Sequence, residues 1–374
     1  MRLFDNPSLL SMDPTSSFLL QLVRVGIHPD AELAPTPADV DWTAVSELAS
    51  AQHVKAIAWD GYARLYEAGM VTVDMDRKKV KGPWLATVYL SFEKKYPEYR
   101  AKIGHLASIL ARNGIRMMVL KGYGVSLNYP VPMHRPCGDV DFWTFGEAVR
   151  ADRVLEEELG VHLHGSPEHH TTFHFEEQYF EHHHHFVSTS AHPSNKVVEA
   201  RLKELAMRGG ETVDIDGHQV FLPSPDFNAL FLLRHAASHL AGSEINIRQI
   251  LDWGLFVHKY HDRIDWKSLE ELVESTKTTA LYQILNGICV DYLGFSPAVF
   301  PAGRHPLEDR VLKYILCPEF SDPCPTFILS QWLWRLRRWR HGTWKQRLVY
   351  PEPLIRTFLV RLKTHLTHPG TLKM

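Results

Sequence analysis

Two aspartates separated by one residue, Asp139 and Asp141, lie in an apolar stretch that also contains Val140 and Phe142. In a β-strand successive side chains point to opposite faces, so this spacing puts both carboxylates on one face and the apolar residues on the other. Two carboxylates on one face repel each other unless a cation lies between them. Mg²⁺, which takes oxygen ligands and usually binds together with substrate phosphates, is the simplest such cation. The pair therefore indicates metal-dependent phosphoryl or nucleotidyl chemistry.

A Lys-Gly dipeptide, Lys121-Gly122, follows the short apolar segment 115–120 and precedes the aspartates. This change of pattern predicts a strand, a turn and then a short helix. A glycine in such a turn lets backbone N–H groups approach phosphate oxygens, and a helix N-terminus favours anions. Lys121 would contact phosphate as a compact charge, and Arg135 as a bidentate fork. Arg135 could equally pair with Asp139 or hold the proline-rich loop in which it lies.

Together these residues resemble the uncharacterised nucleotidyltransferase family of the polymerase-β-like superfamily. The resemblance covers about residues 40–265 and rests on Leu120-Lys121-Gly122, Tyr129, Pro132, Arg135, Gly138-Asp139-Val140-Asp141 and the pair Arg248 and Asp252. It implies a small mixed sheet with helices behind it, and transfer of a nucleoside monophosphate from an NTP, with ATP the expected donor. It also implies that Asp139 and Asp141 hold Mg²⁺, with Mn²⁺ as an alternative. The turn departs from the wider superfamily, which usually has Gly-Gly or Gly-Ser there, so a serine hydroxyl is missing from the phosphate contacts.

Such enzymes usually need a third carboxylate from a neighbouring strand. Residues 179–187 resemble the family's strand, which makes Glu181 our choice for the third catalytic and metal-binding acid. Glu181 would complete a metal site or take the proton from the acceptor hydroxyl. Asp214 and Glu199 are weaker substitutes. The open alternative is that Glu181 is only a half-buried polar residue of the strand.

Three further residues are candidates for the walls of a cleft. His183 shares a strand face with Glu181, whereas His239 and Arg248 fall on predicted helices of the C-terminal half. His235 lies four residues before His239, so the two share a helix face. Arg248 and Asp252 have the same spacing, which predicts an ion pair within one helix.

The chain contains 23 histidines, many of them between positions 162 and 192. Imidazole binds Zn²⁺ and other transition metals, so a His-rich metal-binding protein is one alternative function. Its candidate ligands are His169, His170, His174, His182, His183, His184 and His185. A tetrahedral site needs fixed ligand spacing, however, and a run of four histidines in a strand divides between the two faces. A catalytically idle, nucleotide-binding protein of the same fold is a further alternative.

The periodicity of apolar residues predicts an α+β fold, with a small α+β centre between N-terminal helices and an α-helical C-terminal half. The resemblance implies that this centre is a mixed-sheet nucleotidyltransferase core. We expect an N-terminal helical region over 1–113, the core over 114–222 and the C-terminal helices over 223–374. Strands over 169–175 and 178–187 flank a tight turn, and Asp216-Gly217 is a hairpin signal. A Trp/Arg-rich tail over 332–344 is expected to be a packing helix rather than a surface for nucleic-acid bases.

Composition limits the partners. The net charge of -2 gives no strong signal for nucleic acid or for an anionic membrane. The four cysteines form no C-x-x-C pair, and the sequence shows no apolar run long enough to span a bilayer and no signal peptide. We therefore expect a cytoplasmic protein. The acceptor is left open among a small hydroxylated molecule, an antibiotic, a protein side chain and an RNA end.

Overall fold

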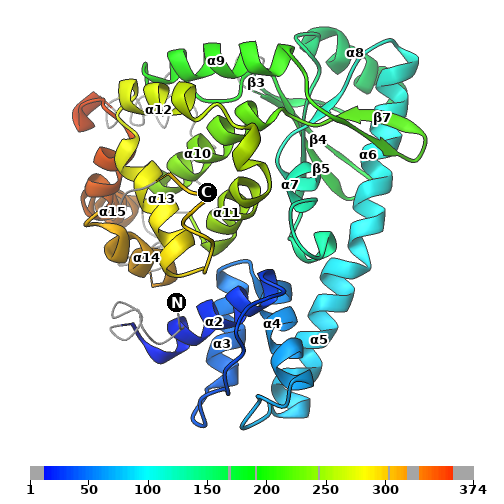
Figure 1. Ribbon diagram of the computed structural model, residues 1–374. Coiled ribbons are helices and arrows are strands. Elements are labelled where there is room, and N and C mark those ends of the chain that lie inside the picture. Colours follow the sequence, from blue (N-terminus) through cyan, green and yellow to red (C-terminus); the bar gives the residue numbers. More distant parts are fainter. Residues whose placement is uncertain are drawn as a thin grey trace.

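The computed structural model describes residues 12–166, 170–189, 192–242, 245–301, 304–317 and 328–356. One sheet lies beside a large group of C-terminal helices, with the N-terminal helices below both (Figure 1). The α-helices are α2 (Pro14–Ile27), α3 (Trp42–Ala51), α4 (Lys55–Glu67), α5 (Gly82–Val88), α6 (Lys95–Arg112), α7 (Gly122–Ser126), α8 (Ala148–Leu159), α9 (Asn195–Met207), α10 (Pro225–Gly242), α11 (Ile247–Tyr260), α12 (Trp266–Ser275), α13 (Thr279–Asp291), α14 (Glu308–Leu316) and α15 (Ile328–Val349). The expected α+β fold is confirmed.

The sheet has seven strands in the order β3-β4-β5-β2-β1-β7-β6. Their bounds are β1 (Met118–Val119), β2 (Asp139–Trp143), β3 (His164–Ser166), β4 (His170–Phe175), β5 (Gln178–His183), β6 (Thr212–Ile215) and β7 (His218–Phe221). The sheet is mixed: β2 runs parallel to β5 and β1 parallel to β7, while the other neighbouring pairs are antiparallel. Both expected hairpins are present, β4–β5 and β6–β7.

The two faces of the sheet have different surroundings. Val140 and Phe142 of β2 are fully buried in a cluster with Leu106 of α6 and Leu155 of α8, so these two helices cover one face. The alternate residue Trp143 packs in the other core cluster, which includes Phe231 of α10. Because side chains alternate along a strand, Asp139 and Asp141 face the side on which α10 lies.

The N-terminal helices are interrupted at two places. Helical spacing over residues 41–69 predicts one helix, but the structure has two, because His53 takes a positive φ of 54° between α3 and α4. Helical spacing over residues 84–113, with a break at Pro97, is also divided, but earlier: a π-helical segment, Tyr89–Glu93, precedes α6. Pro97 lies in the first turn of α6, where its missing N–H would leave the carbonyl of residue 93 without a helical partner.

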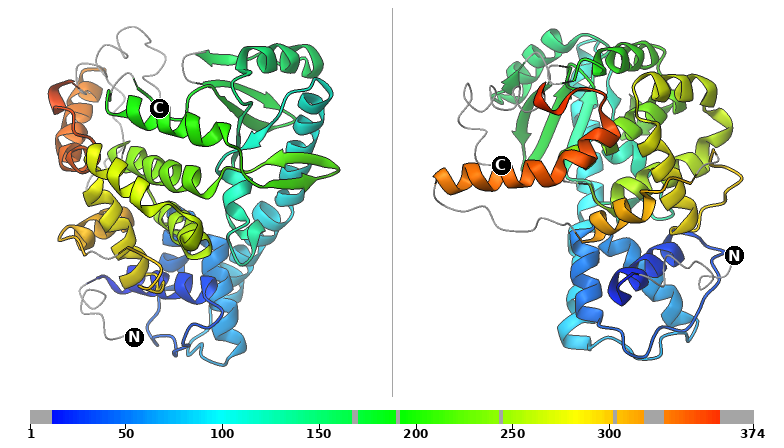
Figure 2. Two further views of the ribbon diagram at one scale, coloured as in Figure 1. Left: turned by 45° about the horizontal axis from the view of Figure 1, so that its top comes forward. Right: turned by 90° about the vertical axis from the view of Figure 1, so that its left-hand side faces the viewer.

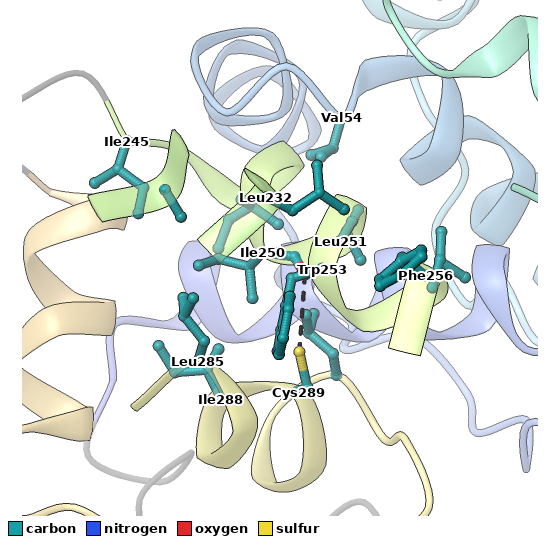
Figure 3. Packing of buried hydrophobic residues seen from close by; sticks show 14 of the residues in the cluster. Val54, Leu232, Ile245, Ile250, Leu251, Trp253, Phe256, Leu285, Ile288 and Cys289 are labelled. Atoms are coloured by element: carbon teal, nitrogen blue, oxygen red, sulfur yellow. Dashed lines mark hydrogen bonds between the residues drawn. The ribbon is translucent and has the colours of Figure 1, made fainter. Parts of the chain in front are cut away.

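The C-terminal helices pack around a second, larger core (Figure 3). Trp253 of α11 is fully buried there and donates its indole N–H to Asn286 of α13 at 2.9 Å. Cys289 lies beside them, its thiol 3.7 Å from the carbonyl oxygen of Ile250. These contacts hold α11 against α13. The division at residues 113 and 222 stays a prediction.

The Trp/Arg-rich tail forms α15, and its two ends differ. Lys345, Leu348 and Val349 are buried, whereas Leu333 and Leu336 are about half exposed. The side chains of Trp332, Arg335 and Arg338 lie outside what the structure describes. In the described ranges, none of the helices combines the length and the apolar character needed to cross a membrane.

Candidate active site

Asp141 and Glu181 are direct neighbours across the parallel strands β2 and β5. The register pairs Asp141 with Glu181 and Asp139 with Tyr179. Residues paired in this way present their side chains on the same face of the sheet. Ligand-capable atoms of Asp141, Glu181 and His183 all lie within 4.8 Å of one another. The structure thus brings the third carboxylate expected from the sequence beside the second.

Lys121 places a positive charge in the middle of this acidic group. Its Nζ lies 2.9 Å from Oδ1 of Asp141, and the two side chains are 14% and 1% exposed. Burial alone would lower the pKa of Lys121, but the carboxylates of Asp141 and Asp139 raise it above its usual value. The ammonium therefore stays charged and compensates the carboxylates.

Asp141 is held in its ionised form. Burial would raise the pKa of Asp141, but the Lys121 ammonium and His183 hold it well below its usual range. Nε2 of His183 lies 2.8 Å from the same Oδ1 that contacts Lys121. An ionised carboxylate with two partners on one oxygen is a typical ligand or charge-stabilising group rather than a proton donor.

Glu181 differs from Asp141 in its proton affinity. Burial, and next the neighbouring charge of Asp141, raises the pKa of Glu181. Asp139 is only partly buried and is not one of the three groups that approach within 4.8 Å. It stands at the edge of the site, where Tyr99 donates a hydrogen bond of 2.9 Å to its carbonyl oxygen.

The Lys-Gly turn is sterically specified. Lys121 and Gly122 both have positive φ, 37° and 23°. A Cβ on Gly122 would lie 2.5 Å from the hydroxyl oxygen of Tyr99, so no other residue fits there without a shift of Tyr99. This turn follows β1 and aims the Lys121 side chain at Asp141.

Arg135 forms an ion pair with Asp252, the residue whose spacing along the helix predicts a pair with Arg248. Nε and Nη2 of Arg135 donate to Oδ1 and Oδ2 of Asp252 at 2.7 and 2.8 Å, and Nη1 donates to the carbonyl oxygen of Gly122. Tyr129 donates to the same carboxylate at 2.7 Å. The expected intrahelical pair of Arg248 with Asp252 is therefore wrong, because Arg135 takes both oxygens.

This buried pair ties the proline-rich loop to α11. Arg135 and Asp252 are each only 5% exposed as side chains, and 117 residues separate them in the chain. Of the alternatives left open by the sequence, the geometry favours Arg135 holding the loop. A phosphate contact of Arg135 stays a prediction, and it would require the guanidinium to leave Asp252.

Helices α10 and α11 form the wall opposite the carboxylates. Burial, and next the charge of Lys121, lowers the pKa of His235 well below its usual value. The same two causes lower the pKa of His239 to about 4, with Arg248 contributing. Phe231 completes this wall, its ring centroid 5.9 Å from Nζ of Lys121. Both imidazoles are therefore neutral near pH 7 and can accept or donate hydrogen bonds.

The histidine run divides between the two faces of the sheet, as alternation requires. His182 and His184 meet Asp152 of α8 on the face away from Asp141, with ligand-capable atoms within 4.8 Å of one another. Nδ1 of His182 lies 2.6 Å from Asp152, and its Nε2 lies 2.9 Å from the hydroxyl of Thr144. Hydrogen bonds thus account for both nitrogens of this imidazole. The transition-metal function stays a prediction, and His169 lies outside the described residues.

Neither substitute for Glu181 joins the site. Both oxygens of Glu199 are engaged: Oε2 accepts from the backbone N–H groups of Phe186 and Val187, and Oε1 lies 3.0 Å from His185. Asp214, on β6, is exposed and accepts from the N–H of Gly217 in its own hairpin. Glu199 therefore fixes the segment that follows β5.

A cavity of about 320 Å³ adjoins the start of β2. Its lining includes Lys95, Tyr96 and Tyr99 of α6, Gly138 before β2, and Gln178 at the start of β5. This volume is at the lower end of those that hold small organic ligands. No pattern in the sequence pointed to it, because the residues come from three separate segments.

No curated protein matches the chain. Among solved structures, the chain is similar to a tRNA nucleotidyltransferase complexed with a primer tRNA and an incoming ATP analogue. The identity is 14%, the coverage 72% of this chain and 96% of that chain, and the TM-score 0.19, which supports no structural argument. The statement that the sequence carries no strong nucleic-acid signal gains no support from it. The description "Uncharacterised nucleotidyltransferase" belongs to the family that matches residues 38–294, well over half of the chain, and this protein is a member of that family.

Proposed function

We propose that this protein transfers a nucleoside monophosphate from an NTP, with ATP the expected donor, to a hydroxyl group of an acceptor and releases pyrophosphate. Family membership supports nucleotidyl transfer in general. The specific donor, metal and leaving group are supported by the pairing of Asp141 with Glu181 across β2 and β5. Lys121 contacts Asp141 at this place, between the sheet and the helices. This is an acidic site with one built-in cation.

The residues present fit a hard divalent cation. Asp141 and Glu181 offer carboxylate oxygens on one face, Asp139 lies at its edge, and Asp141 is ionised. Mg²⁺, or Mn²⁺, held by Asp139 and Asp141 would neutralise triphosphate charge and orient the α-phosphate. Lys121 supplies a second positive charge for phosphate oxygens at the same place.

The reaction balances with the groups at hand. The acceptor oxygen forms a bond to the α-phosphorus, the bond from that phosphorus to the bridging oxygen breaks, and pyrophosphate leaves. Glu181 is the group we assign to accept the hydroxyl proton, since a carboxylate of raised pKa is a better base near neutral pH. His235 and His239 remain neutral and line the opposite wall.

If the protein were a catalytically idle nucleotide-binding protein, no third carboxylate would be expected beside the two aspartates. Glu181, however, is the register partner of Asp141. This geometry favours an active enzyme. The acceptor class stays open.

The test is transfer of label from α-³²P-labelled NTPs, each incubated with the protein, Mg²⁺ and a cell extract. We expect Asp139→Asn, Asp141→Asn and Glu181→Gln to lose at least about 10²-fold of the activity, because each removes a charge or base that acts on the reacting groups. Asp214→Asn is the matched control and should retain full activity, since Asp214 lies on the exposed β6 strand. Full activity in the Asp139 and Asp141 variants would refute the assignment, and no labelled product with any NTP would favour the idle alternative.

A further inference from the structure

Arg234 of α10 is a buried cation with no ion-pair partner in the described ranges of the chain. The residue is 3% exposed, and its Nε and Nη1 atoms have no hydrogen-bond partner there. Nη2 alone is used, donating to the side-chain oxygen of Asn195. Burial lowers the pKa of Arg234, and the nearby Tyr350 and Glu352 offset this only in part. A guanidinium buried in this way costs several kcal/mol of desolvation unless an anion pairs with it.

Other buried cations of this chain are treated differently. Arg135, with 5% exposure, makes a bidentate pair with Asp252, and Lys121 contacts Asp141. Arg234 therefore differs from these two cations, whereas Lys345, which is also buried, donates to the hydroxyl of Tyr314. The unused N–H groups of Arg234 are donors arranged for a planar or tetrahedral oxyanion.

The hydroxyl of Ser194 lies one residue before Asn195, which contacts Arg234. Ser194 is the N-cap of α9, a helix of 13 residues, and its hydroxyl does not cap that helix. Its Oγ is buried and makes no well-formed hydrogen bond among the residues that the structure describes. Burial would raise the pKa of Glu352, and the backbone N–H and the hydroxyl of Ser194 lower it, so this hydroxyl lies near the Glu352 carboxylate. The N-terminus of α9 carries a partial positive charge, so an anion here would be favoured by the helix as well.

The surroundings already contain one carboxylate at this helix end. Oε1 of Glu352, in the segment that follows α15, accepts the backbone N–H of Ser194 at 2.7 Å, and its Oε2 lies 3.3 Å from Nδ1 of His192. Glu352 does not approach Arg234 within ion-pair distance. The chain itself thus shows that a carboxylate binds at the N-terminus of α9. The Arg234 guanidinium lies 5.3 Å from the centroid of the Tyr350 ring, but its Nε and Nη1 atoms have no hydrogen-bond partner in the described ranges.

From these contacts we propose that Arg234 and Ser194 form a binding site for an oxyanion, a phosphate or a carboxylate group of a ligand, next to Glu352. The site is separate from the carboxylates of the transfer site. Arg234 directly precedes His235 on α10, and His235 faces Lys121. A ligand bound to Arg234 would therefore contact the helix that forms one wall of the cleft. α9 and α10 lie side by side, which places both donors on adjoining helices (Figure 2). The proposal does not depend on which reaction the protein catalyses.

The test measures thermal unfolding with added inorganic phosphate, against chloride of equal ionic strength. Phosphate should raise the Tm of the natural protein by about 2 °C, because a ligand that binds only the folded state stabilises it. Arg234→Met should lose this rise. Lys121→Met should keep it, which separates this site from phosphate bound among the residues of the transfer site. A parallel series with acetate distinguishes a carboxylate-selective site from a phosphate-selective one.

The Arg234 variant also gives a prediction for the Tm without added phosphate. Arg234→Met should raise the Tm in chloride alone, because it removes a buried charge that lacks a partner. If Arg234 instead pairs with Glu352 in solution, Arg234→Met and Glu352→Gln would each lower the Tm and their effects would not add. That result, or an equal phosphate response in Arg234→Met and the natural protein, would overturn the proposal.

Discussion

Lys121 sits at the centre of the charge arrangement that defines the site. Its ammonium contacts Asp141 directly and is also influenced by the carboxylates of Asp139 and Glu181. Three acids and one buried cation leave the group with a net negative charge. A divalent cation would neutralise the remaining negative charge. Metal binding should therefore stabilise the site.

Replacing Lys121 with methionine removes that compensation. We expect Lys121→Met to lower the free energy of unfolding by about 2–4 kcal/mol in metal-free buffer, because it removes the ammonium beside the buried Asp141 carboxylate and leaves only His183 in contact with it. Millimolar Mg²⁺ should then raise the Tm of the variant more than that of the natural protein, since the dication replaces the missing charge. Thermal unfolding with and without Mg²⁺ measures both effects.

The matched control is Lys259→Met. The ammonium of Lys259 lies at the surface and donates to the carbonyl oxygen of Leu127, away from the acidic group. This variant should show the same Mg²⁺ response as the natural protein. Equal Mg²⁺ responses in all three proteins would mean that the carboxylates do not bind the cation.

Single residues differ in how far the sequence predicts them. Asp139 and Asp141 were predictable because strand alternation is a local rule, and the geometry keeps them on one face. The partner of Arg135 was not predictable, since Asp252 lies 117 residues away and a nearer arginine had the spacing of a helical pair. Side-chain pairing across the fold depends on packing that no local pattern contains.

At the level of elements, the β4–β5 hairpin carries Glu181 into the site. Its turn residues Glu176 and Glu177 both have positive φ, 45° and 63°. That conformation is unfavourable for residues with a Cβ and is typical of Asn-Gly. The β6–β7 hairpin has the preferred chemistry, with Asp216 at 54° and Gly217 at 86°.

Turn substitutions should therefore act in opposite directions in the two hairpins. Glu176→Asn with Glu177→Gly should raise the free energy of unfolding by about 1–2 kcal/mol, because both new residues accept positive φ more readily. Gly217→Ala should lower it by about 1 kcal/mol for the converse reason. Urea unfolding measures both, and no gain in the first variant beside a clear loss in the second would contradict the explanation.

The sequence predicted these elements unevenly. The β6–β7 turn was indicated by its Asp-Gly pair, whereas the β4–β5 turn was found only from the aromatic and β-branched residues on either side of it. The short strand β3 was not expected, and α14 was expected only as part of the C-terminal helices, without bounds of its own. β3 has three residues, too few for a periodic pattern to show.

Over the whole molecule, the packing of α13 against α14 buries an acid far from the transfer site. Glu308 is 1% exposed, and a Cβ on Gly287 would lie 2.0 Å from its Oε2. Burial, and next the charge of Asp291, raises the pKa of Glu308 to about 7. The other charged groups that act on it are Arg304, which lowers its pKa, and Asp309, which raises it.

This raised pKa makes stability depend on pH. The folded state binds the Glu308 proton more tightly than the unfolded state, so stability is highest below about pH 4.5 for this group and falls as pH rises to about 7. Glu308→Gln should remove this fall and raise the free energy of unfolding by about 2 kcal/mol at pH 8. Urea unfolding at pH 5 and pH 8 measures the difference. Glu274→Gln, an exposed position on α12, should change neither value, and a Glu308 variant with the natural pH dependence would contradict this account.

The overall class was the most predictable feature, since the change from helical to strand periodicity near residue 114 is strong. The wall formed by α10 and α11 was only partly foreseen. His239 and Arg248 were expected near the cleft, but Phe231 and Arg234 look like ordinary members of an apolar helix in the sequence. Which face of α10 meets the sheet is decided by the packing of the C-terminal core.

The central claim is that the α-phosphate of an NTP is transferred and pyrophosphate leaves. The most direct measurement compares α-³²P-labelled and γ-³²P-labelled NTP in parallel reactions with Mg²⁺ and an acceptor-containing extract. We predict that the α-label appears in an acid-stable product while the γ-label is released as pyrophosphate, and that Asp141→Asn abolishes both signals. Appearance of the γ-label in the product, with no pyrophosphate, would identify a phosphoryl transfer and contradict the account.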